Sequence, residues 1–250
     1  GKKLFLHFEA IMGKSKIYVN GKLLAEHFGG YLPVVVDVTD ALEFGKENLI
    51  AVWADNSNDP NYPPGKQQEV LDFTYFGGIY RDCWLIAHNQ VFITDPNYEN
   101  EEAGGGLFVA YNNVSDHSAE VLLKIQIRNS GKKAFKGVVE YELQQPDGQQ
   151  VASLNSVIRI KPGKSTYSSD KLTVKSPMLW SPENPALYNL IVRIRDEKGN
   201  PIDGYRRRIG IRSIEFKGED GFWLNGKPYE APLIGANRHQ DFAIVGNALP

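Results

Sequence analysis

Polar side chains that could hold a hydroxyl-rich ligand follow the apolar run 233–237 near the end of the chain. Asn237 closes this run, and Arg238 and His239 come directly after it. An imidazole can donate or accept a hydrogen bond, so we expect His239 to contact ligand hydroxyls; the alternative is a loop histidine bonded to protein. Such a cluster after a buried strand is typical of the first strand of a (β/α)₈ barrel, where chemistry gathers at the carboxyl ends of the strands.

Two carboxylates, Asp72 and Asp82, form a second candidate site on either side of Gly77 and Gly78. A carboxylate accepts hydrogen bonds without donating any and can take two hydroxyl protons at once, which suits the same class of ligand. For Asp82, a salt bridge to a nearby arginine is the alternative interpretation. The polar stretch 55–68 is too long for a simple strand connection, so we expect it to border the ligand pocket.

Other reactive residue types are interpreted as structural. Glu183 lies in a proline-rich loop, where a lone carboxylate is commonly solvated, and Glu230 likewise gives no catalytic pattern. The five histidines are scattered, and no Cys/His spacing matches a zinc site. The single cysteine, Cys83, precedes the apolar residues 84–86, which predicts that it packs as a small hydrophobic side chain.

Several aromatic side chains could stack on a flat ligand. Trp53, Trp84 and Trp180 lie in apolar runs, which predicts core positions for them. Tyr62 lies in the polar stretch and is expected to be more exposed than these tryptophans.

The charge balance argues against two classes of partner. The chain has 28 Lys and Arg residues against 30 Asp and Glu residues, a formal net charge of -2 without blocks of like charge, so neither nucleic acid nor an anionic membrane surface is expected to bind. No run approaches the ~20 apolar residues of a membrane helix. Because the chain opens within an apparent strand, we expect a window of a longer protein, with cytoplasmic, periplasmic and secreted locations all open.

The elements that position these residues are predicted to be strands throughout. Apolar and polar residues alternate with period two, and no stretch keeps a helical period for three turns. Asn20-Gly21 and Asn225-Gly226 lie between apolar arms, a pattern that predicts tight hairpins. We divide the chain into residues 1–93, residues 94–213 and residues 214–250. The middle segment has the size of an immunoglobulin-like sandwich, roughly 100 residues.

Five motifs resemble, in this order, the N-terminal part of a family 2 glycoside hydrolase of the β-galactosidase type. They are IYVNG at 17–21, DFTYFGGIYRD at 72–82, LWSPENPALY at 179–188, RIGIR at 208–212 and GANRHQD at 235–241. The resemblance covers nearly the whole chain. It implies a sugar-binding jelly-roll domain over 1–93 that lacks its start, an immunoglobulin-like β-sandwich over 94–213, and the start of a TIM barrel over 214–250.

The resemblance also implies a function. The complete protein would be a retaining glycosidase acting on terminal β-galactosides, with both catalytic glutamates outside these 250 residues, so the chain alone is expected to be inactive. Asp72 would project into the active site, Asp82 would lie near a sodium ion or the sugar, and His239 would reach hydroxyls in the −1 subsite. Asn237 and Arg238 would orient neighbouring carboxylates. No required cofactor is evident; a sodium or magnesium ion and a homo-oligomer are compatible with the complete enzyme.

Two alternatives stay open. The same family could act on β-glucuronides or β-mannosides, because the barrel loops that select the hydroxyl pattern are not in this sequence. The chain could instead be a non-catalytic carbohydrate-binding or adhesion module. Such a module has no use for residues 233–241, since their apolar strand would keep unpaired edges.

Overall fold

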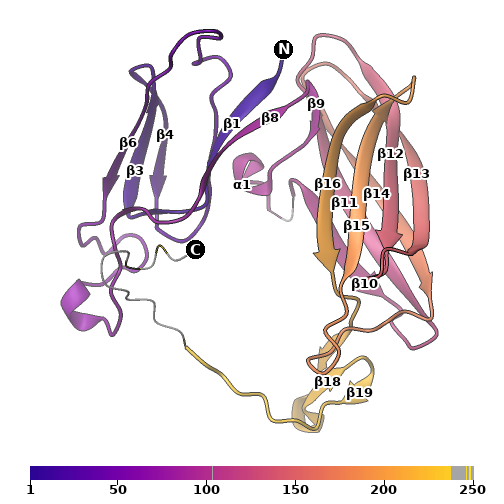
Figure 1. Ribbon diagram of the computed structural model, residues 1–250. Helices are drawn as coiled ribbons and strands as arrows, with labels where there is room; N and C mark the ends of the chain where they lie inside the picture. Colours follow the sequence, from indigo (N-terminus) through magenta and orange to yellow (C-terminus); the bar gives the residue numbers. More distant parts are fainter. Residues whose placement is uncertain (103, 238–245, 247, 249–250) are drawn as a thin grey trace. The chain divides into compact units, whose positions relative to one another are not determined.

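Antiparallel β-sheet makes up most of the structure, a computed structural model that describes residues 1–102, 104–237, 246 and 248 (Figure 1). Every strand pairing in this part of the chain is antiparallel. The all-β prediction is confirmed. The chain divides into two compact units, residues 1–88 with 234–250, and residues 89–233.

The first unit is a small sandwich of two three-stranded sheets. Its elements are β1 (Lys3–Phe8), β2 (Ile11–Met12), β3 (Lys14–Val19), β4 (Lys22–Phe28), β5 (Val34–Asp37), β6 (Ile50–Asp55), the 3-10 helix η1 (Gln68–Val70), β7 (Gly78–Ile79) and β8 (Cys83–His88). The sheets have the orders β5-β1-β8 and β4-β3-β6, and β2 pairs with β7. Their core consists of Leu6, Phe8, Ile11, Ile17, Val19, Val34, Val36 and Val38.

The predicted hairpin at Asn20-Gly21 joins β3 to β4. Both residues have positive φ, 49° and 80°, as a tight primed turn requires. The Asn20 side chain also fixes the next loop, because it donates to the Ala41 carbonyl at 2.9 Å and accepts from the Leu49 amide at 2.9 Å. The alternation of β3 puts Ile17 and Val19 in the core.

The second unit is a larger sandwich followed by a small hairpin sheet. Its elements are β9 (Val91–Ile93), α1 (Pro96–Glu99), β10 (Leu107–Asn112), β11 (Ser118–Asn129), β12 (Phe135–Gln144), β13 (Gln150–Ile160), β14 (Lys164–Lys175), β15 (Tyr188–Asp196), β16 (Pro201–Ile209), β17 (Ile214–Phe216), the 3-10 helix η2 (Gly218–Asp220), β18 (Phe222–Leu224) and β19 (Lys227–Pro228). One sheet has the order β10-β11-β14 with β9 also on β11, and the other has the order β13-β12-β15-β16. The hairpin sheet has the order β17-β18-β19.

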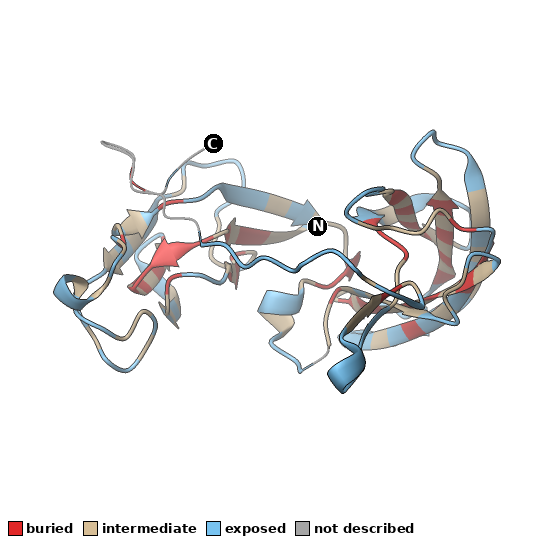
Figure 2. Ribbon diagram, turned by 90° about the horizontal axis from the view of Figure 1, so that it is seen from below, coloured by how far each residue is buried: buried red, intermediate tan, exposed pale blue. Residues whose placement is uncertain are grey.

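Period-two alternation builds the core of this second sandwich. Every other residue of β11, β12 and β15 is buried, and Figure 2 shows this as buried bands along the strands of the larger sandwich. The buried side chains form one continuous cluster that includes Ile125, Tyr141 and Leu190. The predicted turns at 146–148 and 198–200 connect β12 to β13 and β15 to β16. The immunoglobulin-like sandwich is therefore formed from the strands that the alternation predicted.

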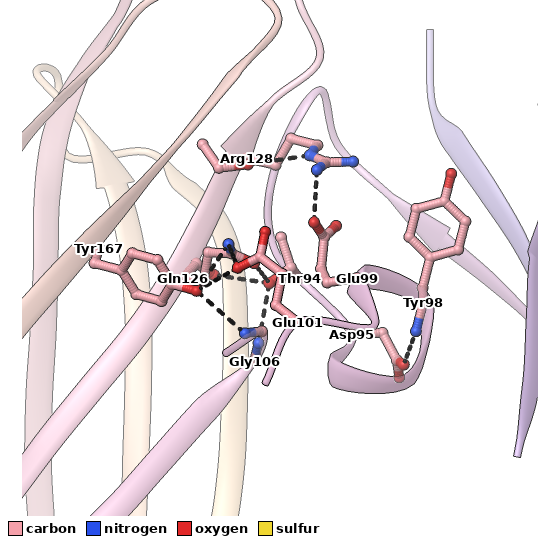
Figure 3. A network of polar contacts seen from close by, with 11 residues as sticks. Thr94, Asp95, Tyr98, Glu99, Glu101, Gly106, Gln126, Arg128 and Tyr167 are labelled. Carbon is pink, nitrogen blue, oxygen red and sulfur yellow. Dashed lines mark hydrogen bonds and ion pairs between the residues drawn. The ribbon is translucent and has the colours of Figure 1, made fainter. Parts of the chain in front are cut away.

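A polar cluster ties the segment after β9 to the first sheet of this sandwich (Figure 3). Gln126 accepts a hydrogen bond from Thr94 Oγ1 at 2.7 Å and donates to Glu101 Oε2 at 3.1 Å and to the Tyr167 hydroxyl at 3.0 Å. The Gly106 amide donates to Thr94 Oγ1 at 2.9 Å. These bonds satisfy the buried side-chain amide of Gln126, and they hold Thr94 and Gly106 against β11.

Glu99, at the end of α1, forms the second part of this cluster. Its Oε2 accepts a hydrogen bond from Arg128 Nη2 at 2.6 Å, while its Oε1 is buried and has no hydrogen-bond partner among the described residues (Figure 3). The carboxylate is almost fully enclosed, with 3% of the side chain exposed. Burial therefore raises the pKa of Glu99, and the Arg128 guanidinium only partly opposes this rise.

Three sequence expectations about buried residues were wrong. Cys83 is exposed, and Trp53 and Trp84 are 46% and 52% exposed. All three lie on β6 or β8, which are edge strands of their sheets. An edge strand lacks a neighbour on one side, so its apolar side chains are covered less than an apolar run in the sequence suggests. Trp180 is half-buried. Tyr62 is half-buried too, so the expectation that it is more exposed than the tryptophans is wrong for Trp53 and Trp84.

The run 233–237 does not form the buried strand that its composition predicts. Residues 232–237 have no strand pairing, and Leu233 and Ile234 are 64% and 86% exposed. A parallel barrel strand needs hydrogen-bonded neighbours on both sides, and the described residues supply none for it.

Candidate functional site

Gln68 clamps the backbone directly after Asp72. Its Nε2 donates to the Phe73 carbonyl at 2.7 Å, and its Oε1 accepts from the Tyr75 amide at 3.2 Å. One amide side chain thus binds both sides of the short segment 73–75. Gln68 lies in η1, and Asp72 lies in the bend 72–73 at the start of the segment that Gln68 binds.

The polar loop 55–68 packs against the same segment at two further points. The Tyr75 hydroxyl donates to Asn58 Oδ1, and the Tyr75 side chain is buried. Gly77 lies so close to Asn56 that an added Cβ would be 2.8 Å from its Oδ1. Loop 55–68 and segment 72–77 are therefore one packed structure, and glycine at position 77 permits the close approach.

The first half of the loop is held by charged and backbone contacts. Asp55 accepts from the Ser57 amide at 2.8 Å, and Asp59 accepts from the Asn61 amide at 3.0 Å. Lys14 Nζ lies 2.9 Å from Asp59 Oδ2 and 5.7 Å from the centroid of the Tyr62 ring. The hydrogen bond from Lys14 holds the pKa of Asp59 below its ordinary value, so the loop keeps this carboxylate charged.

A small pocket lies between this loop and β2. It is lined by Met12, Gly13, Asn56, Ser57, Asp59, Tyr62, Pro64, Gly65, Lys66 and Tyr75. Gly13 has φ +86°, and an added Cβ would be 2.1 Å from the Asp55 carbonyl oxygen, so only glycine fits at this wall. The pocket encloses about 10 Å³, room for a single water molecule. The pocket is therefore too small to hold a sugar ring.

Both predicted carboxylates of this region are exposed. Among the described residues, neither Asp72 nor Asp82 has a hydrogen-bond or ion-pair partner for its side chain. The Asp82 carbonyl accepts a hydrogen bond from the Glu9 amide at 2.9 Å, which fixes the backbone there. Arg81 lies 5.3 Å from the centroid of the Tyr80 ring. The salt bridge considered for Asp82 is thus not formed in the described part of the chain.

The second group of predicted site residues is described only in part. Asn237 is exposed, whereas Arg238 and His239 lie outside the described residues. Gly246 belongs to the same compact unit as Asp72. It lies against Phe76, where an added Cβ would be 2.5 Å from the aromatic ring. The end of the chain therefore contacts the segment that follows Asp72.

Some residues at this site escaped the sequence analysis. Gln68 and Asn58 bind backbone or hydroxyl groups of residues 73 and 75, and Asn56 packs against Gly77. In the sequence, these three amides look like any other polar loop residues. Glu183, rejected as a catalytic candidate, accepts a hydrogen bond from the Tyr229 hydroxyl at 2.8 Å. That contact lowers the pKa of Glu183 and gives it a structural role in the second unit.

The described residues contain neither a metal-binding group nor a membrane-spanning helix. Among them, no group of His, Cys, Asp and Glu side chains has an arrangement that could hold a metal ion. No helix in this part of the chain is long and apolar enough to cross a membrane.

Two family models match the chain. The model described as "Glycosyl hydrolases family 2, sugar binding domain" matches residues 1–89, and the model described as "Glycosyl hydrolases family 2" matches residues 106–212. The chain belongs to glycosyl hydrolase family 2. The loop 55–68, Asp72 and Asp82 all lie within the match to the family 2 sugar binding domain.

Curated relatives in family 2 carry two different names. A beta-galactosidase of Thermoanaerobacter pseudethanolicus is 34% identical over 251 residues, which cover 100% of this chain and 31% of the relative. A beta-glucuronidase of Bacteroides fragilis is 32% identical over 251 residues, covering 100% of this chain and 34% of the relative. The chain thus spans about a third of the length of the curated relatives it matches.

A solved structure in family 2 has the same fold over the whole chain. The crystal structure of the Bacteroides uniformis beta-glucuronidase superposes with a TM-score of 0.87 at 32% identity, covering 100% of this chain and 29% of that enzyme. The two β-sandwiches are therefore those of the family 2 N-terminal region.

Proposed function

We propose that residues 1–250 are the front section of a family 2 glycoside hydrolase that cleaves terminal β-galactosides. In this proposal the first unit supplies one wall of the sugar pocket, and the second unit is scaffold. The observation that carries the proposal is Asp72, an exposed carboxylate without a partner among the described residues, on a segment clamped by Gln68. A free carboxylate on a fixed backbone is ready to accept hydrogen bonds from sugar hydroxyls.

The end of the chain is proposed to complete this wall. Gly246 lies against Phe76 in the segment after Asp72, which supports a pocket shared by residues 72–82 and 237–241. His239 would donate or accept a hydrogen bond at a second hydroxyl, and Asn237 and Arg238 would orient neighbouring carboxylates. Hydrogen bonds that shorten as positive charge develops on the sugar stabilise the transition state more than the bound substrate, so they raise turnover as well as affinity.

We assign no nucleophile and no acid/base residue within 1–250. Retaining glycosidases use two carboxyl groups about 5–5.5 Å apart on opposite faces of the bond that breaks. In the proposal, both groups come from the remainder of the polypeptide, which in the curated relatives makes up about two thirds of the length. The role of this chain is to bind and orient the sugar.

A β-glucuronide is the second candidate substrate, because a relative that is 32% identical bears that name. The charge of the wall favours the galactoside. A glucuronide carries its own carboxylate, which Asp72 and Asp82 would repel, whereas a galactoside presents neutral hydroxyl donors that they can accept. β-Mannosides also present neutral hydroxyls, so the charge of the wall does not separate them from galactosides. The substrate comparison below separates the two.

The test compares nitrophenyl β-galactoside, β-glucuronide and β-mannoside as substrates of the complete polypeptide, with the 250-residue chain assayed beside it. We expect the highest kcat/KM with the galactoside and no turnover by the 250-residue chain. A preference for the glucuronide or the mannoside would replace the substrate assignment. Turnover by the 250-residue chain that a mutation within it abolishes would overturn the division of roles. Sugar binding by a complete polypeptide without any hydrolysis would indicate an adhesion module.

A further inference from the structure

The sheet β4-β3-β6 carries exposed aromatic side chains on its outer face (Figure 1). Lys14 and Lys16 alternate along β3 with buried residues, so both lysines point away from the core. Phe28 on β4 lies opposite Lys14, and Trp53 on β6 lies opposite Lys16. Directly opposed residues of an antiparallel pair point to the same face of the sheet. Phe28 and Trp53, which are 61% and 46% exposed, therefore share the outer face with the two lysines.

The polar loop 55–68 adds a third aromatic ring to this face. The centroid of the Tyr62 ring lies 6.4 Å from that of Phe28, with an angle of 54° between the ring planes. Lys16 Nζ lies 5.8 Å from the centroid of the Trp53 ring, as Lys14 Nζ does at 5.7 Å from that of Tyr62. We call these three rings and two lysines the aromatic platform. The cation–π contacts stabilise the rings in place at the surface.

The charges within the aromatic platform are paired. Lys14 Nζ lies 2.9 Å from Asp59 Oδ2, and Lys16 Nζ lies 2.9 Å from Glu26 Oε1. Asp55 lies opposite Lys14 on β6 and adds a third carboxylate. Two cations beside three carboxylates give no net attraction for an anionic ligand, but they offer several hydrogen-bond donors and acceptors. The charge pattern therefore favours a neutral ligand that is rich in hydroxyl groups.

The ion pairs also argue against a protein segment as the cover of the rings. An apolar protein surface packed on the platform would remove both ion pairs from water, and the desolvation of an ion pair can outweigh its attraction. A sugar ring has an apolar face of C–H groups surrounded by hydroxyls. It can pack its C–H face on an aromatic ring while its hydroxyls donate to the carboxylates and accept from the ammonium groups.

We propose that the aromatic platform binds a neutral oligosaccharide chain. Phe28 and Trp53 lie on the two outer strands of the sheet and are offset by two residues in register, which separates their Cα atoms by about 12 Å. One sugar ring cannot cover both positions, so the ligand is a chain of sugars with one ring on Trp53 and another on Phe28 and Tyr62. This binding uses neither Asp72 nor Asp82 and does not depend on which terminal sugar is cleaved.

Affinity electrophoresis of the complete polypeptide tests the proposal. The retardation of the protein is measured in native gels that contain β-1,4-galactan, galactomannan or polygalacturonate, over a range of polymer concentrations that yields a Kd. We expect at least one of the two neutral polymers to retard the protein, and polygalacturonate to leave its mobility unchanged because that polymer is an anion.

Substitutions on the platform assign the binding to it. Trp53→Ala and Phe28→Ala should each weaken the affinity about 5- to 30-fold with unchanged thermal unfolding, because each removes an exposed ring on which a sugar packs. Trp53→Tyr should retain most of the affinity. Phe44→Ala is the matched control, since Phe44 is 68% exposed in a turn outside the sheet, and it should bind like the wild type.

The same variants separate this inference from the proposed function. Trp53→Ala should keep wild-type kcat/KM on nitrophenyl β-galactoside, whereas Asp72→Asn should lose kcat/KM and keep the retardation. A polypeptide that is retarded through Trp53 but cleaves no galactoside would reject the proposed function and leave the platform assigned.

Four results would overturn the proposal. Wild-type retardation of both Trp53→Ala and Phe28→Ala would place the binding elsewhere, and a lack of retardation by either neutral polymer would remove it. Equal retardation by polygalacturonate would contradict the assignment of a neutral ligand. A dimer in sedimentation that Trp53→Ala dissociates, with retardation unchanged, would assign the face to a second copy of the chain.

Discussion

The two units are both antiparallel β-sandwiches, yet they differ in how completely they bury their own apolar residues. In the described residues, the second unit has one continuous cluster of 20 buried side chains, whereas the main core of the first has eight. The first unit also leaves Leu85 on the edge strand β8 60% exposed, and its longest loop makes polar contacts with the backbone of residues 73 and 75. The comparison indicates that the second unit closes its own core, whereas the first leaves an edge strand uncovered.

The largest expected effect compares the same mutation in both units. Leu190 in the second unit is 0% exposed, so Leu190→Ala should lower the free energy of unfolding of that unit by about 2–5 kcal/mol. Leu85 in the first unit is 60% exposed, so Leu85→Ala in the 250-residue chain should change stability by less than about 0.5 kcal/mol. Urea unfolding followed by hydrogen exchange on peptides from each unit measures both values.

The matched pair of leucines tests the comparison directly, because the two substitutions remove the same atoms from an exposed and from a fully buried position. An equal cost for Leu85→Ala and Leu190→Ala in the 250-residue chain would show that the two sandwiches are closed to the same degree, against the comparison drawn above.

A smaller effect distinguishes two carboxyl groups, one in each unit, by the sign of their contribution to the pH dependence of stability. In the second unit, burial raises the pKa of Glu99 above its ordinary value of 4.5. The folded state therefore holds this proton more tightly than the unfolded state, and the contribution of Glu99 to stability should rise as the pH falls toward 4.5. Glu99→Gln should remove this rise, whereas the exposed neighbour Glu102→Gln should not.

Asp37 in the first unit should respond to acid in the opposite direction. Burial tends to raise the pKa of Asp37, but hydrogen bonds from Lys3 and Thr39 outweigh it and hold the pKa below its ordinary value of 3.8. Stability from these contacts is present above that value and is lost as the pH falls through the lower folded pKa. Asp37→Asn should flatten this loss, with exposed Asp40→Asn as control. The measurement is the difference in unfolding free energy between wild type and each variant from about pH 6 to about pH 3, the carboxyl range. Differences that change with pH in the same direction for Glu99→Gln and Asp37→Asn would contradict the assignment.

The strands could be predicted from the sequence because apolar and polar residues alternate along them. Along β15 each buried position is an alternate residue of the sequence, and β11 departs from this alternation only at Gln126; the Asn-Gly pairs have the positive φ that their turns require. The alternation does not show which strands pair side by side in a sheet. Cys83 and Trp84 look like core residues in the sequence, but they lie on an edge strand, so their exposure depends on which strand pairs beside them.

The sequence points to the charged residues of the candidate site, but not to the side chains that fix the backbone beside them. Asp72 and Asp82 stand out because they flank a glycine pair. Gln68 gives no such signal, since both of its hydrogen bonds go to backbone atoms of residues 73 and 75, and backbone positions leave no pattern in side-chain types. The same limit applies to Asn56, which packs against the backbone of Gly77.

The most direct test of the central claim measures kcat/KM of the complete polypeptide carrying Asp72→Asn or Gln68→Ala, with the exposed neighbour Gln67→Ala as control. Asp72→Asn should lower kcat/KM by about 10- to 100-fold with unchanged thermal unfolding, because the charge is lost and one of the two acceptor oxygens is replaced by an NH2 donor that leaves a sugar hydroxyl unpaired. Gln68→Ala should lower it by a smaller factor, and the double variant should be no worse than Asp72→Asn, because Gln68 acts by positioning Asp72. Gln67→Ala should match the wild type. Wild-type kcat/KM for both Asp72→Asn and Gln68→Ala would contradict the account and reduce the first unit to scaffold.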